Sequence, residues 1–140
     1  MRVIVFVKAT KDSEASVLPS PELIEAMGKY NEELINAGIM VGGDGLKASR
    51  FGKRIAFDGA SRTVTDGPFA ETRELVAGFW IWEVKDMDEA VAWAKRCPNP
   101  MPGPSDLELR PVITMDDFAE TMTEEGAAIH ARNEQRLAGA

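Results

Sequence analysis

Two stretches of this chain carry apolar side chains on both faces of a predicted strand, which limits how the sheet can be covered. Residues 3–7 are β-branched or aromatic throughout, and residues 79–84 place large apolar side chains on both faces. Strands of an antiparallel sheet with one face in water alternate between apolar and polar residues, and these two strands do not. Both faces of the sheet are therefore expected to be covered.

Two helices are indicated by signals at their ends. Ser20 is suited to the N-cap of the first helix, Pro21 to its first turn and Gly38 to its C-terminal stop. Asp86 and Glu89 have the spacing of an N-cap residue and its partner, which opens the second helix. Each helix has one apolar stripe, formed by Leu23, Met27, Tyr30 and Leu34 in the first and by Ala90, Val91, Trp93, Ala94 and Cys97 in the second.

The remaining strands are shorter. Residues 39–41 begin a strand that a glycine-rich run then interrupts, and residues 107–110 form the last strand after a proline-rich loop. Runs at 54–57 and 62–65 flank Asp58-Gly59-Ala60-Ser61 and predict a β-hairpin. The predicted order is β-α-β-β-β-α-β with the helices on one side of the sheet, which is an α+β domain of the ferredoxin-like class.

Helices on one side of a small sheet leave its other apolar face uncovered. A second copy is the economical cover for a chain of 140 residues, so we predict a face-to-face homodimer. Cover by the chain's own tail is the alternative. We place the main domain at residues 1–113 and a helical extension at 114–140, where Asp116-Asp117-Phe118 and Thr123-Glu124-Glu125 open two helices with few apolar residues. Such an extension gains its order by docking.

The composition excludes several classes of function. A formal net charge of −7 and a pI near 4.8 argue against direct nucleic-acid binding, which needs a basic surface. A single cysteine, Cys97, excludes an intrachain disulfide framework and a multi-cysteine metal site, and a single histidine, His130, excludes a poly-histidine metal centre. The sequence has no export signal and no apolar stretch of membrane length. We therefore expect a cytoplasmic protein that needs no metal or other cofactor.

The charge is distributed unevenly along the chain. Residues 114–140 hold six acidic and two basic residues, a net charge of −4. The segment from Lys47 to Arg73 holds six basic and three acidic residues, a net charge of +3. A basic segment in an acidic protein is suited to a small anionic ligand; the alternative is a hairpin whose charges simply face water.

Three features suggest chemistry but have simpler interpretations. Gly42-Gly43-Asp44-Gly45 is followed neither by Lys-Ser/Thr nor by a helix, so we interpret it as a bulged strand rather than a phosphate-binding loop. His130 stands on the sparse C-terminal helix and is interpreted as a surface residue. Cys97 is interpreted as a small buried apolar residue, because no histidine and no cluster of basic residues is close to it in the sequence.

The segment Asp66-Gly67-Pro68-Phe69-Ala70-Glu71-Thr72-Arg73-Glu74 has the most specific chemistry. Asp66 ends a strand, the Gly-Pro pair fixes a turn, and Phe69 is placed to anchor the loop in the core. With neighbouring charges, Asp66 would bind a polar ligand or carry out acid–base chemistry. Alternatively, its carboxylate accepts hydrogen bonds from backbone N–H groups and closes the turn. The candidate ligand-binding residues beside it are Arg54, Arg62, Glu71 and Arg73.

This segment resembles the signature of the DGPF branch of the YCII-related family. The tail, with Asp117-Phe118 and the stretch 122–125, resembles an extension that some members carry. The family implies a ferredoxin-like fold that pairs into a dimeric α+β barrel, in a bacterial protein. The resemblance covers most of residues 1–113 and includes Tyr30–Gly38, Val41–Leu46, Gly78-Phe79-Trp80, Asp88-Glu89-Ala90, Arg96-Cys97-Pro98 and Glu108–Val112.

The resemblance also suggests roles. Many YCII-like domains share a histidine and an aspartate to which an enzymatic role has been attributed. Only Asp66 has a counterpart here, because no histidine precedes His130. Relatives in bacteria are often encoded near extracytoplasmic-function sigma factors, which implies a regulatory setting.

Three functions follow from these observations. The leading one is a dimeric α+β barrel protein that binds a small polar or anionic molecule in a pocket near Asp66-Gly67-Pro68-Phe69, with Arg54 or Arg62 at the pocket wall. The second is a cofactor-independent enzyme of isomerase or lyase type, with Asp66 as the general base. The third is an interaction protein whose dimer and tail recruit a sigma factor.

Overall fold

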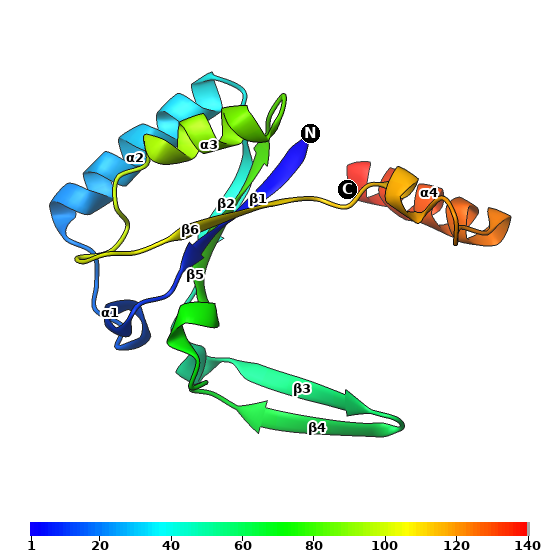
Figure 1. The fold of residues 1–140 in the computed structure, drawn as a ribbon, viewed down its shortest axis with the longest axis horizontal. Coiled ribbons are helices and arrows are strands. Elements are labelled where there is room, and N and C mark those ends of the chain that lie inside the picture. Colours follow the sequence, from blue (N-terminus) through cyan, green and yellow to red (C-terminus); the bar gives the residue numbers. More distant parts are fainter. Residues whose placement is uncertain (140) are drawn as a thin grey trace.

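The computed structural model describes residues 1–139, which form an antiparallel sheet with two helices on one side and two projecting segments on the other (Figure 1). β5 pairs antiparallel with both β1 and β2, and β1 pairs antiparallel with β6. This α+β arrangement is compatible with the predicted ferredoxin-like fold. The four strands lie in the order β2 (Met40–Gly45), β5 (Val76–Glu83), β1 (Arg2–Lys8) and β6 (Leu107–Pro111).

Two helices, α2 (Pro21–Asn36) and α3 (Met87–Lys95), cover one face of the sheet (Figure 1). The Ser20 hydroxyl accepts a hydrogen bond from the backbone N–H of Leu23, and Gly38 follows α2 with a φ of +74°. At the start of α3 the carboxylate of Asp86 accepts a hydrogen bond from the backbone of the third helical residue. Both helices therefore begin at the predicted N-cap residues, and α2 ends at the predicted glycine.

The core lies between the sheet and these helices. Every second residue of β1 and β5 contributes to it, which confirms that one predicted face of each strand is buried. The Tyr30 hydroxyl donates a hydrogen bond of 2.7 Å to the carbonyl oxygen of Trp93 and so joins α2 to α3. The buried cluster consists of Val3, Val5, Tyr30, Leu34, Ile39, Trp80, Trp82, Val84 and Ala90.

The opposite side of the sheet, which we call the open face, carries a small apolar cluster. Ile4 lies opposite Ile81 and Phe6 lies opposite Phe79, so four apolar side chains meet across β1 and β5. All four are only partly buried. Because α2 and α3 both lie on the other side of the sheet, neither covers this cluster (Figure 1).

The glycine-rich run is part of a bent edge strand, as predicted. The pairing of β2 with β5 shifts register between Met40 and Gly42. A Cβ atom on Gly43 would lie 2.6 Å from the carbonyl oxygen of Phe79, closer than real Cβ atoms approach. Glycine at this position therefore allows the backbones of β2 and β5 to lie close together.

The predicted hairpin is present, but it stands apart from the sheet. β3 (Lys53–Asp58) and β4 (Ser61–Asp66) form their own two-stranded sheet, with Gly59 at a φ of +56° in the turn. All residues of both strands are exposed. The predicted count of three strands between the helices is therefore wrong: four strands separate α2 from α3, because the hairpin is inserted between β2 and β5.

The segment before α2 contains a one-turn helix, α1 (Lys11–Glu14), which Thr10 caps. Two local predictions are also wrong. Val91 is 39% exposed, because it lies on the side of α3 away from the core. Phe69 is only half-buried and lies outside the core, since the base of the hairpin is displaced from the sheet.

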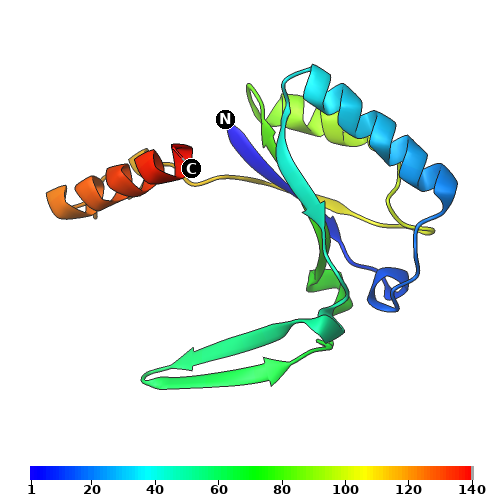
Figure 2. The ribbon, with the colours of Figure 1, turned by 180° about the vertical axis from the view of Figure 1, so that it is seen from behind.

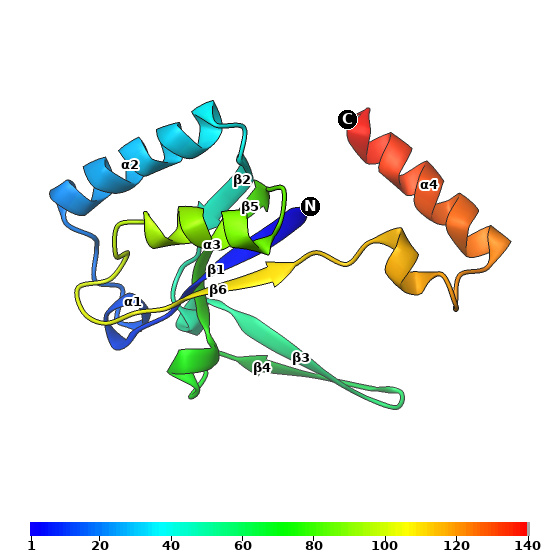
Figure 3. The same ribbon diagram turned by 45° about the horizontal axis from the view of Figure 1, so that its top comes forward.

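The tail, residues 112–139, leaves the sheet after β6 and forms the two predicted helices, η3 (Met115–Phe118) and α4 (Glu124–Ala138). The Thr123 hydroxyl accepts a hydrogen bond from the Gly126 N–H and caps α4. No residue of α4 is buried, and the helix stands away from the sheet on the side opposite α2 and α3 (Figures 2 and 3). Within one chain, the tail does not cover the open face.

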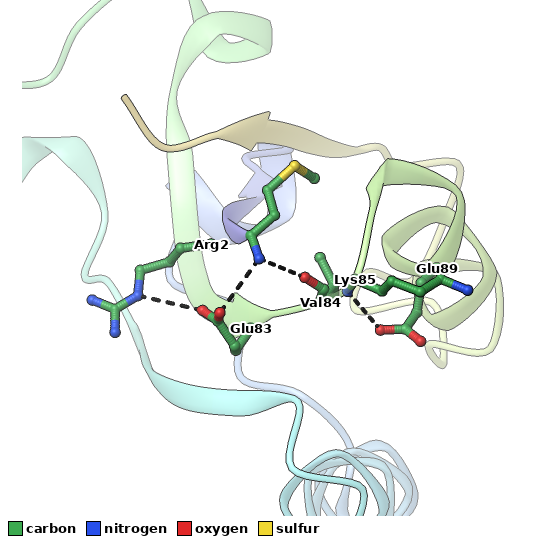
Figure 4. A network of polar contacts seen from close by, with 6 residues as sticks. Arg2, Glu83, Val84, Lys85 and Glu89 are labelled. Carbon is green, nitrogen blue, oxygen red and sulfur yellow. Dashed lines mark hydrogen bonds and ion pairs between the residues drawn. The ribbon is translucent and has the colours of Figure 1, made fainter. Parts of the chain in front are cut away.

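Hydrogen bonds and ion pairs join the start of β1 to the end of β5 (Figure 4). The amino group of Met1 donates a hydrogen bond of 2.7 Å to the carbonyl oxygen of Val84 and another of 3.3 Å to the carboxylate of Glu83. The same carboxylate lies 3.9 Å from Nε of Arg2. These contacts hold the two strands of the open face in register at one end.

Candidate functional site

Asp66, the leading site residue of the sequence, lies at the base of the hairpin. Its carboxylate accepts a hydrogen bond of 2.5 Å from Nζ of Lys53, its partner across the two strands. The Asp66 side chain is 74% exposed, so water screens this ion pair strongly. The pair joins the two ends of the hairpin.

The residues after Asp66, which we call the signature turn (66–69), pack on the short helix η1 (Ser49–Phe51). A Cβ atom on Gly67 would lie 1.8 Å from the carbonyl oxygen of Ser49. The backbone N–H of Phe69 donates a hydrogen bond of 3.1 Å to the Ser49 hydroxyl. The turn is therefore seated against η1 with no space for a side chain at Gly67.

Glu14 links this turn to α1. Its carboxylate accepts a hydrogen bond of 3.0 Å from the backbone N–H of Ser49 and a second one from the Ser49 hydroxyl. The side chain of Arg50 donates to the backbone carbonyl of Glu14 at 3.3 Å. Nothing in the local sequence indicates this cluster, because Glu14 and Ser49 are far apart along the chain and meet only in the fold.

The four other candidate residues do not gather around Asp66. The guanidinium of Arg54 stacks on the ring of Phe69 at 3.9 Å, whereas that of Arg62 donates hydrogen bonds of 2.8 Å to backbone carbonyls at the far turn of the hairpin. Glu71 and Arg73 are exposed. Of the five candidates, only Arg73 lines one of the three hollows described for residues 1–139, a shallow one beside β6.

A hollow lies between α2 and the edge of the sheet formed by β2 and β5, and we call it the main hollow because it reaches the buried Trp80. Its volume is about 470 Å³, which falls within the range of small-molecule sites. The walls come from separate elements: α2, three strands and the proline-rich loop. The side chains that give the hollow its apolar character include Val7, Leu23, Met27, Met40, Trp80 and Met101.

Asn31 provides a polar group in these apolar walls. Its Oδ1 accepts a hydrogen bond of 2.9 Å from the indole Nε1 of Trp80. The amide nitrogen of Asn31 carries two N–H donors, and neither is hydrogen-bonded to another of residues 1–139. Sequence reasoning missed Asn31; the available signal was a polar residue four positions after Met27, beside the apolar stripe of the helix.

Gly28 leaves part of this wall open. It lies inside α2, lines the main hollow, and a Cβ atom built on it would meet nothing within 4 Å. Glycine in a helix interior costs roughly 0.5–1 kcal/mol relative to alanine. Gly28 therefore destabilises α2, and any larger residue at this position would place a side chain that narrows the hollow.

A second hollow of about 920 Å³ continues from the main one and shares Leu23 and Met101 with it. Lys47 and Arg50 lie on its rim, with their charged groups 5.4 Å and 4.6 Å from the centre of the Phe51 ring. Neither cation forms an ion pair with an acidic side chain in the described part of the chain. Part of the basic segment therefore borders a hollow.

Cys97 and His130 lie outside these hollows. Cys97 is partly buried against the core after α3, and burial raises the pKa of its thiol to about 11. A thiol held protonated is a poor nucleophile. His130 lies on exposed α4, where its Nε2 is 3.2 Å from the carboxylate of Glu134. Both positions agree with the non-catalytic interpretations of these residues.

We predict slow alkylation of Cys97 in the folded protein. A pKa raised from 9.0 to about 11 lowers the thiolate fraction about 100-fold at pH 8. The higher nucleophilicity of a more basic thiolate recovers part of this loss, so iodoacetamide should react about tenfold more slowly than with the protein in 8 M urea. Equal rates in the two conditions would contradict the burial. Because the folded pKa is the higher one, the associated stabilisation is present below pH 9 and is lost as the pH rises through 11.

Two further observations concern metal-ligand groups and membrane-spanning helices in residues 1–139. They contain no group of three or more His, Cys, Asp or Glu side chains placed to hold a metal ion. None of the helices they form has both the length and the apolar character required to cross a lipid bilayer.

Comparison with known proteins gives two matches. A family model described as the YCII-related domain matches residues 1–116. An uncharacterised protein of Rhizobium meliloti (strain 1021) is 41% identical over 49 residues, which is 35% of this chain and 40% of that protein. The chain therefore spans less than half the length of this relative. The family match includes the whole sheet, α2, α3 and the hairpin, whereas α4 lies beyond it.

Proposed function

The chain belongs to the YCII-related domain family, and from this premise we propose that it binds a small, mainly apolar molecule in the main hollow. The observation that carries the proposal is a space of about 470 Å³ between α2 and the sheet, with apolar walls and one amide group. Ligand sites generally combine an apolar lining with a few polar groups that orient the ligand.

The residues of the hollow suit a ligand with an apolar body. Met27, Met40 and Met101 come from three different elements and line the same space. Methionine side chains are flexible and polarisable, so they adapt to ligands of irregular shape. The Asn31 amide would donate a hydrogen bond to one acceptor on the ligand, such as a carbonyl or ether oxygen. The ligand class is therefore a small apolar molecule with an oxygen acceptor.

Filling the wall at Gly28 is the experiment that tests this site. We expect the apolar fluorescent probe 1-anilinonaphthalene-8-sulfonate to bind the wild-type protein, and the Gly28→Leu variant to bind it about tenfold more weakly, because the leucine occupies the opening. Lys29→Leu is the matched control, since it adds the same side chain at the next residue, which is exposed and does not line the hollow. Equal affinity of both variants, measured by fluorescence titration, would exclude the main hollow as the site.

We also propose that two copies pack through their open faces into an α+β barrel, the arrangement implied by the resemblance to the DGPF branch. The partly buried cluster of Ile4, Phe6, Phe79 and Ile81 supports this, because apolar side chains in the middle of a sheet gain from cover. The domain would comprise residues 1–113, followed by the extension 114–140. A cytoplasmic bacterial setting linked to a sigma factor remains part of the proposal.

An enzymatic alternative keeps Asp66 as a general base. It is based on the ion pair of Asp66 with Lys53 and on the cation Arg54 beside that pair, whereas Arg62 lies at the far turn of the same hairpin. A second copy would have to cover this exposed position to form a closed site. The Asp66 carboxylate would also have to lie within about 3 Å of the substrate proton, or reach it through one water molecule. Glu71 and Arg73, which follow the turn, would complete the polar wall.

A further inference from the structure

Two segments leave the body of the protein on the same side, away from α2 and α3. The hairpin extends from one end of the sheet, and the tail extends from the other end after β6 (Figures 1 and 2). The open face lies between them. Both segments therefore project toward the side from which a partner would approach the sheet.

The hairpin is poorly stabilised by its own chain. All residues of β3 and β4 are exposed, and a two-stranded hairpin alone is at best marginally stable in water. One face carries Ile55 opposite Val64 and, two residue pairs further out, Phe57, which is 71% exposed. This face offers apolar area that the chain leaves in contact with water.

The tail is also poorly stabilised by contacts within its own chain. α4 has 15 residues and none is buried, and isolated helices of this length are marginal in water. Among the residues that the structure describes, no hydrogen bond or ion pair joins α4 to the sheet, to α2 or to α3. Several apolar side chains of the tail are exposed, including Ile113, Phe118, Ile129 and Leu137.

The charges of the two segments are opposite. The segment from Lys47 to Arg73, which contains the hairpin, has a net charge of +3, and residues 114–140 have a net charge of −4. Contact of a tail with a second tail, or of a hairpin with a second hairpin, brings like charges together. Contact of a hairpin with a tail brings opposite charges together, so electrostatics selects this pairing.

We infer that the hairpin of one copy binds the tail of a second copy, and that its own tail binds the partner's hairpin. The inference rests on the proposed dimer. A two-fold axis between the two segments places each hairpin beside the partner's tail, in keeping with the self-complementary interface of a symmetric dimer. The apolar side chains of both segments are then covered, and both marginal elements gain a tertiary contact. We call this pair of contacts the clasp.

The size of the open face also favours a clasp. A stable dimer buries about 800 Å² on each partner. The four apolar side chains of the open face are already partly covered within their own chain, so they fall short of that area. The hairpin and the tail would supply the remainder, which makes a second copy a better occupant than an unrelated protein.

Reciprocal charge reversal tests the clasp. The hairpin variant, Arg54→Glu with Arg62→Glu, and the tail variant, Glu120→Lys with Glu134→Lys, are each expected to raise the dimer dissociation constant about tenfold or more in low salt. An equimolar mixture should assemble more tightly than either variant alone, because a mixed dimer regains one wild-type contact, between the unchanged tail (−4) of one copy and the unchanged hairpin segment (+3) of the other. The control is Glu25→Lys with Glu32→Lys, which reverses two exposed charges on α2 and should dimerise as the wild type does. Sedimentation equilibrium gives each constant, and circular dichroism confirms that every variant is folded.

The outcomes separate the clasp from the dimer itself. A wild-type protein that stays monomeric at micromolar concentration overturns both. A wild-type dimer with variants that assemble equally well overturns the clasp and leaves the dimer standing. If each variant assembles weakly and the mixture does no better, the contacts lie within one copy and the clasp is wrong. As an independent measurement, added salt should weaken the wild-type dimer, because the clasp joins opposite charges; a constant unaffected by salt counts against it.

Discussion

The Gly67→Ala variant is expected to unfold about 10 °C below the wild type, a loss of about 3 kcal/mol. A Cβ atom on Gly67 would lie 1.8 Å from the carbonyl oxygen and 2.6 Å from the carbonyl carbon of Ser49. Both are backbone atoms, so no side-chain rotation relieves the overlap. The turn would have to leave η1.

That displacement would break more than one contact. The Ser49 hydroxyl accepts the hydrogen bond from Phe69 and donates to the carboxylate of Glu14. Moving the turn would also misplace Asp66 relative to Lys53 and loosen the base of the hairpin. The effect should therefore appear in thermal and urea unfolding, together with faster proteolysis of residues 53–66.

Gly103→Ala is the matched control. A Cβ atom on Gly103 meets nothing within 4 Å, and the residue lies in the proline-rich loop away from the hairpin. We expect its free energy of unfolding to stay within about 0.5 kcal/mol of the wild type. A Gly67→Ala variant as stable as this control would show that the turn is not seated against η1. The prediction gives the Gly-Pro pair of the signature a structural role that is independent of any chemistry at Asp66.

The parts of the fold that the sequence predicts well depend on local signals. Ser20 and Asp86 cap helices through hydrogen bonds to residues three positions away, and Gly38 and Gly59 adopt the positive φ angles that end a helix or make a turn. Each signal acts within a few residues, so the chain around it is sufficient to identify it.

The errors arise where a distant part of the chain decides the outcome. The hairpin has the same strand pattern whether it joins the sheet or stands apart, so the number of strands in the sheet could not be read from it. Phe69 was expected in the core, yet it packs under Arg54 because the base of the hairpin is displaced from the sheet. Val91 fits the apolar period of α3, but the short helix does not turn that side to the core.

The main hollow illustrates the same limit for the site. It exists because α2, the bent edge strand and the proline-rich loop meet in space, and Asn31 and Met101 become neighbours only there. The sequence contained two hints on one helix, the interior Gly28 and the polar Asn31 one turn after Met27. By contrast, the opposite charges of the hairpin and the tail follow from the sequence alone, whereas the position of both segments on the same side of the sheet follows only from the fold (Figure 3).

The largest effect on assembly is expected from Ile81→Asp, which should convert the proposed dimer to monomers. Ile81 lies in the middle of the open face opposite Ile4, so in a face-to-face dimer the new carboxylate would be buried against apolar side chains of the partner. Burying an unpaired charge costs several kcal/mol, and about 4 kcal/mol corresponds to a 1,000-fold rise in the dissociation constant. Within one chain Ile81 is only partly buried, so the monomer should keep its fold.

Ile35→Asp makes the same substitution on the outer surface of α2, where Ile35 is 58% exposed. We expect this control to retain the wild-type assembly, because α2 covers the side of the sheet away from the open face. Light scattering after size exclusion, from about 1 to 100 μM protein, spans the expected shift in dissociation constant. If Ile81→Asp assembled like Ile35→Asp, the open face would not be the interface, and its apolar cluster would need another cover. Since no element of residues 1–139 lies over this cluster, the cover would have to come from a different molecule, whose surface would then have to match the opposite charges of the hairpin and the tail.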